Sequence, residues 1–404
     1  MLQAIDEAGR NIIPASLGRE ALKILKKNRN PFYCPLCEKL VILKAGKKMI
    51  PHFAHISVNN CGGGEGSYHE TGKWMLFQWL ALQNLDVALE AQLPEPNRRP
   101  DLLVNAGGRR IAIEYQCAKM PHEEVLARMN DYKQGGIEQI WILGGNRLKR
   151  LGRNILSLDK FTQYFLHQYK KSSNEFLYFF CPNTGQFSIF QNPLFSTRRK
   201  ALGNLKFIPI SELKFTNLFQ PLNDKAEGIA QFWRREKELF RLSASRRQFG
   251  KYLQFQQWLY LKGWHAETLP ACIGLPVRNA HKMNLATFQW QAKIVMGILK
   301  PSMRHTVTIK FIKNAMTRFR RKEEQMPIFH NETDPIIDYI MLLESLGYLK
   351  VESNGAIHLK NPIELTKNVE HSLQEDKLIM DKWLRLQAMS NQKRSMIPAN
   401  SAIL

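Results

Sequence analysis

Two carboxylates and an amide stand at a spacing that suits metal-assisted chemistry on a phosphodiester. Asp101 follows Pro100 at the start of a predicted strand, Glu114 comes thirteen residues later, and Gln116 lies two residues beyond it. Since side chains alternate along a strand, Glu114 and Gln116 project from the same face. Two carboxylates at one point suit Mg²⁺ or Mn²⁺, which activates water and stabilises charge on a phosphate. The spacing predicts catalytic roles for Asp101, Glu114 and Gln116, with both acids as metal ligands.

This acid spacing is common by chance, but polar side chains on two neighbouring helices strengthen it. Glu65, His69 and Lys73 repeat every four residues before the strands, and Arg128 and Tyr132 repeat likewise after them. Residues four apart share one face of a helix. We expect all five to converge on one edge of the sheet, where His69, Lys73, Arg128 and Tyr132 are candidates for DNA contact. Each of them alone also fits a solvated helix face.

A second constellation has the spacing of a metal site. Cys34 and Cys37 form a C-x-x-C pair, and His52, His55 and Cys61 follow within 30 residues. Zinc takes four nitrogen or sulfur ligands, so one of the five is spare. We expect Cys34, Cys37, His55 and Cys61, with His52 as the alternative, because the apolar pair between the histidines would then pack beneath the metal. A redox pair is disfavoured, since no thioredoxin-like βαβ pattern surrounds it.

The elements that must position these side chains follow a recognisable order. Residues 1–62 hold an N-terminal hairpin, a helix capped by Ser16 and the Cys/His module, and residues 62–64 are three glycines. A helix, three strands, a helix and a strand then fill residues 63–165. Their predicted ranges are Tyr68–Leu85, Val87–Ala91, Asp101–Asn105, Arg110–Cys117, His122–Gln134 and Glu138–Leu143.

Residues 166–404 read as a basic region that is mainly helical after a hairpin at 177–191. Within 290–362, a helix at Asp334–Leu346 is followed by a tight two-strand hairpin, which resembles the end of a winged helix. The preceding segment Ile309–Lys322 is basic and amphipathic, so it is a candidate groove-reading helix, although a solvated basic face has the same pattern. The arginines expected on DNA there are Arg318, Arg320 and Arg321.

Charge points to an anionic partner. The 404 residues include 58 Lys and Arg against 35 Asp and Glu, and residues 191–330 alone hold 25 against eight. Such a surplus favours nucleic acid or an anionic membrane surface. No apolar run is long enough for a transmembrane segment, the N-terminus lacks the apolar core of a signal peptide, and six cysteines make no disulfide framework. We therefore expect a cytoplasmic protein of two or three domains.

Aromatic residues lie among the cations of the same segment. They would stack on bases of single-stranded DNA, or pack in a core as aromatics at helical spacing commonly do. The residues are Trp233, Phe240, Tyr252, Phe255, Trp258, Tyr260 and Trp264.

Several motifs in one order resemble the CoiA family of competence proteins. They cover about the first 150 residues: FYCPLC at 32–37, VILKAG at 41–46, PHFAH at 51–55, ExxxHxxxK at 65–73, RPDLLV at 99–104, IAIEYQCAKM at 111–120, the Arg128 and Tyr132 pair, and IWILGG at 140–145. The resemblance implies an α/β fold: a restriction-endonuclease-like PD-(D/E)xK core after a zinc-ribbon-like module. It also implies action on internalised DNA in natural transformation, with a RecA-type recombinase as partner.

Transferred by position, the resemblance puts Asp101, Glu114 and Gln116 on the nuclease triad and Glu65 on the auxiliary acid of the first helix. The third position of the broad nuclease pattern is usually Lys, so Gln116 is a departure that lacks a charge, which Lys73 or Lys119 would have to supply.

Three functions remain open at this point. The first is a Mg²⁺-dependent deoxyribonuclease acting on single-stranded or branched DNA. The second is a non-catalytic DNA-binding recombination mediator that uses a degenerate nuclease fold. The third is a zinc-organised adaptor for proteins or for an anionic membrane.

Overall fold

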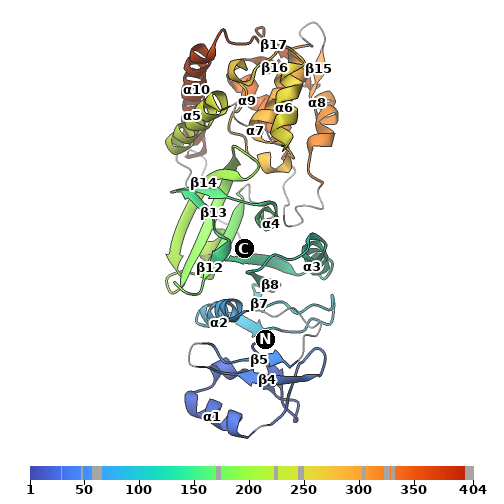
Figure 1. The fold of residues 1–404 in the computed structure, drawn as a ribbon, viewed down its shortest axis with the longest axis vertical. Coiled ribbons are helices and arrows are strands. Elements are labelled where there is room, and N and C mark those ends of the chain that lie inside the picture. Colours follow the sequence, from blue (N-terminus) through green and yellow to red (C-terminus); the bar gives the residue numbers. More distant parts are fainter. Residues whose placement is uncertain are drawn as a thin grey trace.

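The computed structural model contains three regions in a row along its longest axis (Figure 1). An N-terminal β module lies at one end, a long mixed sheet in the middle and a mainly helical region at the other end. The residues that the structure describes are 1–28, 30–46, 49–56, 66–169, 174–222, 226–243, 250–302, 306–322, 328 and 333–395.

The N-terminal module is a five-stranded sheet with the order β2-β1-β3-β4-β5. Its elements are β1 (Ala4–Ile5), β2 (Asn11–Ile12), α1 (Arg19–Lys27), β3 (Phe32–Tyr33), β4 (Leu40–Lys44) and β5 (His52–His55). The pairing of β1 with β2 confirms the predicted N-terminal hairpin. Ser16 is not the cap of α1, as we expected: its hydroxyl donates to the carbonyl of Ile13 at 2.8 Å within a 3-10 turn, and the helix begins after Gly18.

The middle region is a nine-stranded sheet with the order β10-β11-β14-β13-β12-β9-β8-β7-β6. Its first half confirms the predicted succession of a helix, three strands, a helix and a strand. These elements are α2 (Ser67–Ala81), β6 (Asp86–Leu89), β7 (Leu102–Ala106), β8 (Arg109–Gln116), α3 (His122–Gln134) and β9 (Glu138–Gly144). Strands β7 and β8 are antiparallel, whereas β8 and β9 are parallel and joined through α3.

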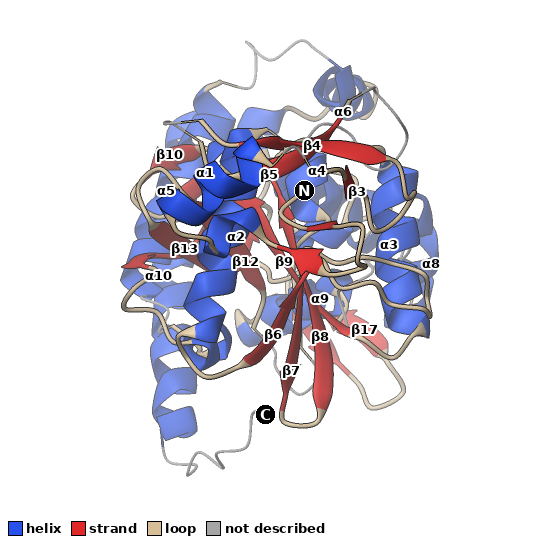
Figure 2. Ribbon diagram, turned by 90° about the horizontal axis from the view of Figure 1, so that it is seen from below, coloured by secondary structure: helices blue, strands red, loops and turns tan. Residues whose placement is uncertain are grey.

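Helices α2 and α3 cover opposite faces of this sheet, as Figure 2 shows. Ile113 and Tyr115 of β8 pack in the cluster with α2, while Ala112 packs with α3, as the alternation of a strand requires. Helix α2 sits so close that a Cβ atom at Gly72 would lie 2.1 Å from the Tyr115 ring. Only glycine permits this approach without displacing a buried ring.

The sheet continues past residue 165, where we expected the nuclease-like region to end. The further elements are β10 (Arg150–Gly152), β11 (Ile155–Ser157), α4 (Lys160–Gln163), β12 (Phe176–Cys181), β13 (Gln186–Phe195) and β14 (Lys200–Pro209). The pairing of β12 with β13 confirms the hairpin predicted at 177–191, and β12 runs parallel to β9. Strand β14 was not predicted, because the chain after 195 read as helical; its pairing with β13 along most of both strands decides its conformation.

The helical region confirms the predicted helix and hairpin near 340–360. Its main elements are α5 (Ala226–Leu242), α6 (Gly250–Tyr260), α7 (Thr287–Ile294), β15 (Val307–Thr308), α8 (Ile309–Met316), α9 (Pro335–Ser345), β16 (Leu349–Val351), β17 (Ala356–Leu359) and α10 (Val369–Ser395). The last three strands form a small sheet with the order β15-β17-β16. None of the helices in the described part of the chain combines the length and apolar character needed to cross a membrane.

The helix expected over Ile309–Lys322 is shorter than predicted. It ends at Met316, and a single 3-10 turn follows it. Beyond this turn the chain is held by tertiary hydrogen bonds: the Asn284 amide donates to the carbonyl of Arg320 at 2.8 Å, and the Arg321 N–H donates to Lys282 O at 2.8 Å. These bonds fix an extended conformation that helical periodicity does not reveal.

Candidate functional site

The Cys/His module brings together three of its expected ligands. The ligand atoms of Cys34, Cys37 and His55 all lie within 4.8 Å of one another. The Leu36 N–H donates to the Cys34 sulfur at 3.4 Å, so the turn between the cysteines directs a backbone donor at this sulfur. This is a donor set of two sulfurs and one imidazole nitrogen, consistent with zinc.

Of the two histidines, the structure favours His55. Its Nε2 is buried and has no hydrogen-bond partner among the described residues, and burial lowers the pKa of the ring, which keeps the imidazole neutral. His52 instead uses Nδ1 to donate to the carbonyl of Ile50 at 2.8 Å. Phe53 is fully buried beneath the site, which is the reason for which we expected His55. Cys61 lies outside the described residues.

The predicted acids meet at one end of the β7–β8 hairpin. Leu102 pairs with Ile113, so continuing the same register sets Asp101 opposite Glu114 at the end of the hairpin. The Asp101 carboxylate accepts the N–H of Tyr115 at 2.8 Å, which fixes it against β8. The Asp101 side chain is 13% exposed and that of Glu114 only 3% exposed.

Lys73 lies at the centre of a buried cluster of carboxylates beside Asp101. Its ammonium group is 2.5 Å from Glu90, 3.4 Å from Glu70 and 3.6 Å from Asp101. The lysine is only 1% exposed. Burial opposes ionisation of Glu90, but the charges of Lys73 and then Arg99 bring the pKa of that carboxyl below its ordinary value. The cluster is therefore a set of buried charges that compensate one another.

His69 lies one turn before Lys73 on α2 and belongs to the same cluster. Its Nε2 donates to the carbonyl of Tyr115 at 2.6 Å and lies 3.5 Å from Asp101. His69 and Lys73, which we expected on DNA, are both buried, and in the structure they hold the acid and its strand in place. Glu65, the expected auxiliary acid of this helix face, lies outside the described residues.

Glu114 is held from the other side of the sheet by α3. The Tyr132 hydroxyl donates to one carboxylate oxygen, and Arg128 Nη1 lies 3.5 Å from the other. Burial alone would lower the pKa of Arg128, but the carboxylates of Glu114, Glu124 and Asp101 raise it above its ordinary value. Burial and then the charge of Glu114 raise the pKa of Tyr132, so its phenol keeps its proton and remains a donor. Tyr132 is thus buried with its hydroxyl on the Glu114 carboxylate, whereas Arg128 is partly exposed.

Gln116 and Lys119 occupy less central positions. The Gln116 amide donates to the carbonyl of Ala118 at 2.6 Å, within its own turn. Lys119 is 64% exposed and pairs with Asp159 at 3.2 Å. Of the two lysines that we considered as a source of the missing charge, Lys73 is therefore the one placed beside Asp101.

Comparison with known proteins covers nearly the whole chain. Three family models match in order: the N-terminal domain of competence protein CoiA over residues 15–63, its nuclease-like domain over 65–223 and its C-terminal domain over 229–373. The chain belongs to the CoiA family. Competence protein CoiA of Bacillus subtilis (strain 168) is similar to it, with 25% identity over 376 residues that span 89% of this chain and 98% of that protein.

The nuclease-like domain of the CoiA family coincides with the nine-stranded sheet. Its match ends at residue 223, after β14, and the C-terminal match begins at 229, within α5. The boundary that we expected at 165 therefore falls inside this family domain. Strands β12–β14 belong to it because they hydrogen-bond to β9 and to one another.

The three arginines expected on DNA lie in different environments of the CoiA C-terminal domain. Arg318 is exposed and stacks over Phe319, with 4.7 Å from the guanidinium carbon to the ring centre. Arg320 forms an ion pair with Asp334, the residue that caps α9. Arg321 is 8% exposed, so it lies beneath the surface rather than on it.

The aromatics of the same CoiA domain divide between core and surface. Trp233, Phe240 and Phe255 are buried in one hydrophobic cluster, with Trp258 and Trp264 packed against it. Tyr260 is exposed at the end of α6. Core packing is thus the main role of these rings.

Sequence reasoning expected Glu90 at this edge of the sheet but missed Glu70, the other acid beside Lys73. Glu70 and Glu90 are both buried, and the Leu2 N–H donates to Glu90 at 3.1 Å, which ties the start of the chain to this site. One available signal was the position of Glu70 three residues before Lys73, on the same helix face. Spacing alone does not reveal that the face turns inward.

Proposed function

We propose that this chain is a metal-dependent deoxyribonuclease that acts in the cytoplasm on internalised DNA during natural transformation and promotes its recombination. In this proposal, α2 to β9 form a restriction-endonuclease-like PD-(D/E)xK core. The order of these elements, the CoiA nuclease-like domain and the similarity to a competence protein support it.

The observation that carries the proposal is the placement of Asp101 opposite Glu114 at one end of the β7–β8 hairpin. Carboxylate oxygens are the ligands that Mg²⁺ prefers in proteins, and one or two of them are enough to bind it. Asp101 and Glu114 would hold Mg²⁺ or Mn²⁺ with water completing its shell. The ion would supply an activated water and stabilise the charge that develops on the phosphate.

The chain's own residues would position this chemistry. Lys73 is the cation that α2 places beside Asp101, and it holds this acid from 3.6 Å. Tyr132 and Arg128 orient Glu114. Gln116 would orient water with its amide oxygen, because among the described residues only its amide nitrogen is engaged, with Ala118.

A cleavage assay tests this proposal. Wild type, Asp101→Asn and Asp86→Asn are compared on labelled single-stranded, double-stranded and branched DNA, with Mg²⁺, with Mn²⁺ or with neither. Asp86 is the matched control, because it is an exposed acid on β6 that contacts Asn105. We expect metal-dependent cutting in wild type and Asp86→Asn and none in Asp101→Asn. Equal cutting by Asp101→Asn would overturn the assignment.

A second candidate is a non-catalytic DNA-binding mediator that works with a RecA-type recombinase. The observation that favours it is the enclosure of Glu114, which is 3% exposed between Tyr132 and Arg128, together with a neutral Gln116. The same assay separates the two: DNA binding by wild type and Asp101→Asn, without cutting of any substrate, would establish the mediator.

For the N-terminal module we propose a structural zinc ion held by Cys34, Cys37 and His55, with Cys61 as fourth ligand. Structural zinc contributes directly to folding. We expect one zinc per chain by elemental analysis of the purified protein, loss of the metal in Cys34→Ser, and retention in Cys181→Ser. Equal zinc content in both variants would contradict the site.

For residues 290–362 we keep the winged-helix proposal, supported by the small sheet that closes around α8 and α9. Helix α9 precedes the hairpin but has no Lys or Arg in PIIDYIMLLES. Contact with DNA would therefore come from α8 and the arginine-rich turn after it. Neutralising Arg318 tests this contact, as described in the Discussion.

A further inference from the structure

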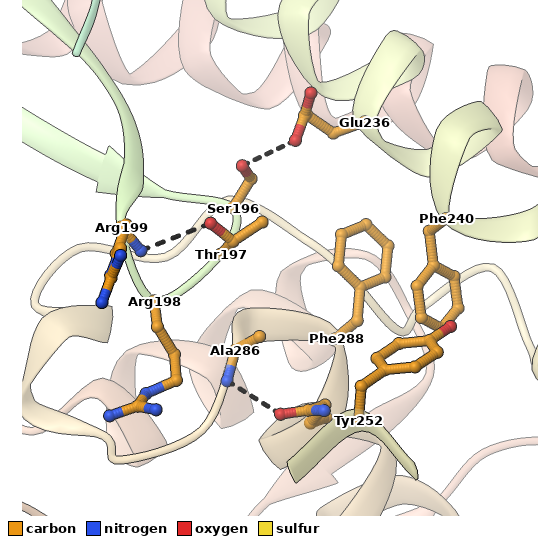
Figure 3. A pocket seen from close by; sticks show the side chains of 10 residues that line it. Ser196, Thr197, Arg198, Arg199, Glu236, Phe240, Tyr252, Ala286 and Phe288 are labelled. Atoms are coloured by element: carbon orange, nitrogen blue, oxygen red, sulfur yellow. Dashed lines mark hydrogen bonds between the residues drawn. The ribbon is translucent and has the colours of Figure 1, made fainter. Parts of the chain in front are cut away.

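A cavity of about 410 Å³ lies between the nine-stranded sheet and the helical region (Figure 3), and its lining residues are distinct from those of the acid site. One side is the turn from Ser196 to Arg199, which connects β13 to β14. The other sides come from α5, α6 and α7. Its volume falls within the range of cavities that bind small organic groups.

The inner wall of this cavity is aromatic. Phe240 of α5 and Phe288 of α7 stack with their ring centres 4.3 Å apart and their planes 16° apart. Tyr252 of α6 reaches the same wall, and Figure 3 shows its ring beside that of Phe240. An aromatic wall of this kind offers a sequence-tolerant surface to a nucleobase.

The mouth of the cavity is cationic. Arg198 and Arg199 are exposed, and no ion pair involves either guanidinium within the described part of the chain. Their backbone is fixed to the sheet region: Arg199 O accepts the Leu158 N–H at 2.7 Å, and Arg198 O accepts the Gln163 amide at 2.9 Å. The two cations therefore project from a turn whose backbone is held by hydrogen bonds.

The acid in the wall does not neutralise these cations. Glu236 accepts the Ser196 hydroxyl at 2.7 Å and pairs with Lys200. Its charge is thus already compensated within the protein. The carboxylate also helps to hold the turn from Ser196 to Arg199 in place.

A third arginine, Arg321, is close enough for the charge of Arg198 to act on it. Arg321 is 8% exposed, and its Nε and Nη1 atoms make no hydrogen bond with any described residue. Burial and then the charge of Arg198 lower the pKa of Arg321 to about 10. Arg321 does not line the cavity, but the charge of Arg198 acts on it, so positive charge is in excess on this side of the turn.

We propose that this cavity takes one unpaired nucleotide of single-stranded DNA, with the base against Phe240, Phe288 and Tyr252 and the flanking phosphates on Arg198 and Arg199. That the ligand is DNA rests on the proposed function. A base paired within a duplex cannot enter, because entry requires it to leave its stack. The site therefore gives the chain a preference for single strands, independently of the acids that would cleave them.

The first test measures binding of the full chain to a labelled oligo-dT strand over a range of salt concentrations, without added Mg²⁺ or Mn²⁺. Each phosphate contact contributes about 0.7 to the log–log salt slope for single strands. Arg198→Gln with Arg199→Gln should lower the slope by about 1.4. The matched control is Arg109→Gln with Arg110→Gln, which removes two exposed arginines at the far end of β8. Equal slopes for the two double variants would overturn the proposal.

The second test concerns the base. A strand with a single 2-aminopurine reports stacking by loss of fluorescence. We expect wild type and Tyr252→Phe to quench it and Tyr252→Leu to quench it less, with about five- to tenfold weaker binding of single strands and unchanged binding of duplex. Equal quenching by Tyr252→Leu and Tyr252→Phe would refute the aromatic wall.

The two proposals fail separately. If the Arg198/Arg199 and Tyr252 variants bind like wild type while cutting still depends on Asp101, the cavity proposal falls and the nuclease stands. If these variants lose single-strand binding while wild type cuts no DNA, the cavity stands and the nuclease falls.

Discussion

Cations are used in opposite ways at the acid site and at the cavity. Lys73 is buried among three carboxylates, and Arg128 lies between two. At the cavity, Arg198 and Arg199 are exposed and form no ion pair with any described residue. The first arrangement fixes acids in place, whereas the second leaves positive charge available to a ligand.

This difference distinguishes cations that stabilise the fold from cations that are available to a ligand, which net charge alone does not do. The surplus of Lys and Arg in residues 191–330 predicts an anionic partner but does not say which cations meet it. The structure distinguishes them by pairing and exposure. Removal of a paired, buried cation should reduce stability, and removal of an exposed, unpaired cation should reduce binding.

The largest effect is expected from Lys73→Met. The substitution keeps the length of the side chain but leaves buried carboxylates without their counterion, which costs about 3–5 kcal/mol. Urea unfolding measures the loss. Lys119→Met is the matched control, because that lysine is exposed and its pair with Asp159 contributes at most about 1 kcal/mol. Equal losses would show that the buried cluster is not the stabilising feature.

Tyr132→Phe should have the next largest effect. It removes a hydroxyl that donates to the buried carboxylate of Glu114, and a hydrogen bond to a charged group contributes about 1.5–3 kcal/mol. The unfolding free energy should fall by that amount, and any cleavage rate should fall with it. Tyr260→Phe, at an exposed position, should change stability by less than about 0.5 kcal/mol. If Tyr132→Phe changed neither the unfolding free energy nor the cleavage rate, Tyr132 would have no role at this site.

A buried acid where the nine-stranded sheet meets the helical region makes stability depend on pH. Burial raises the pKa of Glu175 to about 8, although Arg278 and Lys282 oppose this shift. His281 faces it at 3.8 Å and stays neutral, since burial lowers its pKa well below the ordinary value. Between the ordinary value of 4.5 and about 8, the folded state keeps a proton that the unfolded chain releases, so stability falls as pH rises.

Glu175→Gln tests this directly. The contribution of Glu175 changes by about 1.4 kcal/mol per pH unit within that window. The variant lacks the titration, so its unfolding free energy relative to wild type should increase from pH 5 to pH 8. Asp86→Asn, an exposed acid substitution, should show no such trend. A constant difference between Glu175→Gln and wild type would contradict the raised pKa.

The smallest effect on stability is expected from Arg318→Gln. The side chain is exposed, so unfolding should change by less than about 0.5 kcal/mol. If Arg318 contacts a phosphate, the salt slope for single-stranded DNA should fall by about 0.7. Arg109→Gln is the control. An unchanged slope would remove this surface from DNA binding and leave the cavity as the basic site.

Periodicity and turn residues were enough to predict the order of elements from α2 to β9, since turn residues separate their apolar runs. They were not enough for β14, whose conformation depends on pairing with β13. The end of α8 was missed for the same reason, because bonds to Lys282 and Asn284 end the helix from outside it.

The site could be predicted as a list of residues but not as an arrangement. Spacing predicted Asp101 and Glu114, and the apolar pair between the two histidines favoured His55 over His52. It could not show that α2 turns Lys73 inward onto Glu90, or that α3 places the Tyr132 hydroxyl on Glu114. Both contacts depend on how helices pack on the sheet, and this is set by residues far apart in sequence.

The close contact between Gly72 and Tyr115 constrains how this chain can change over generations. A methyl group at position 72 would collide with a ring that is itself held by a hydrogen bond to the carbonyl of Phe180. Position 115 would have to accept a smaller residue before position 72 could accept a larger one. The order of the two substitutions is therefore fixed.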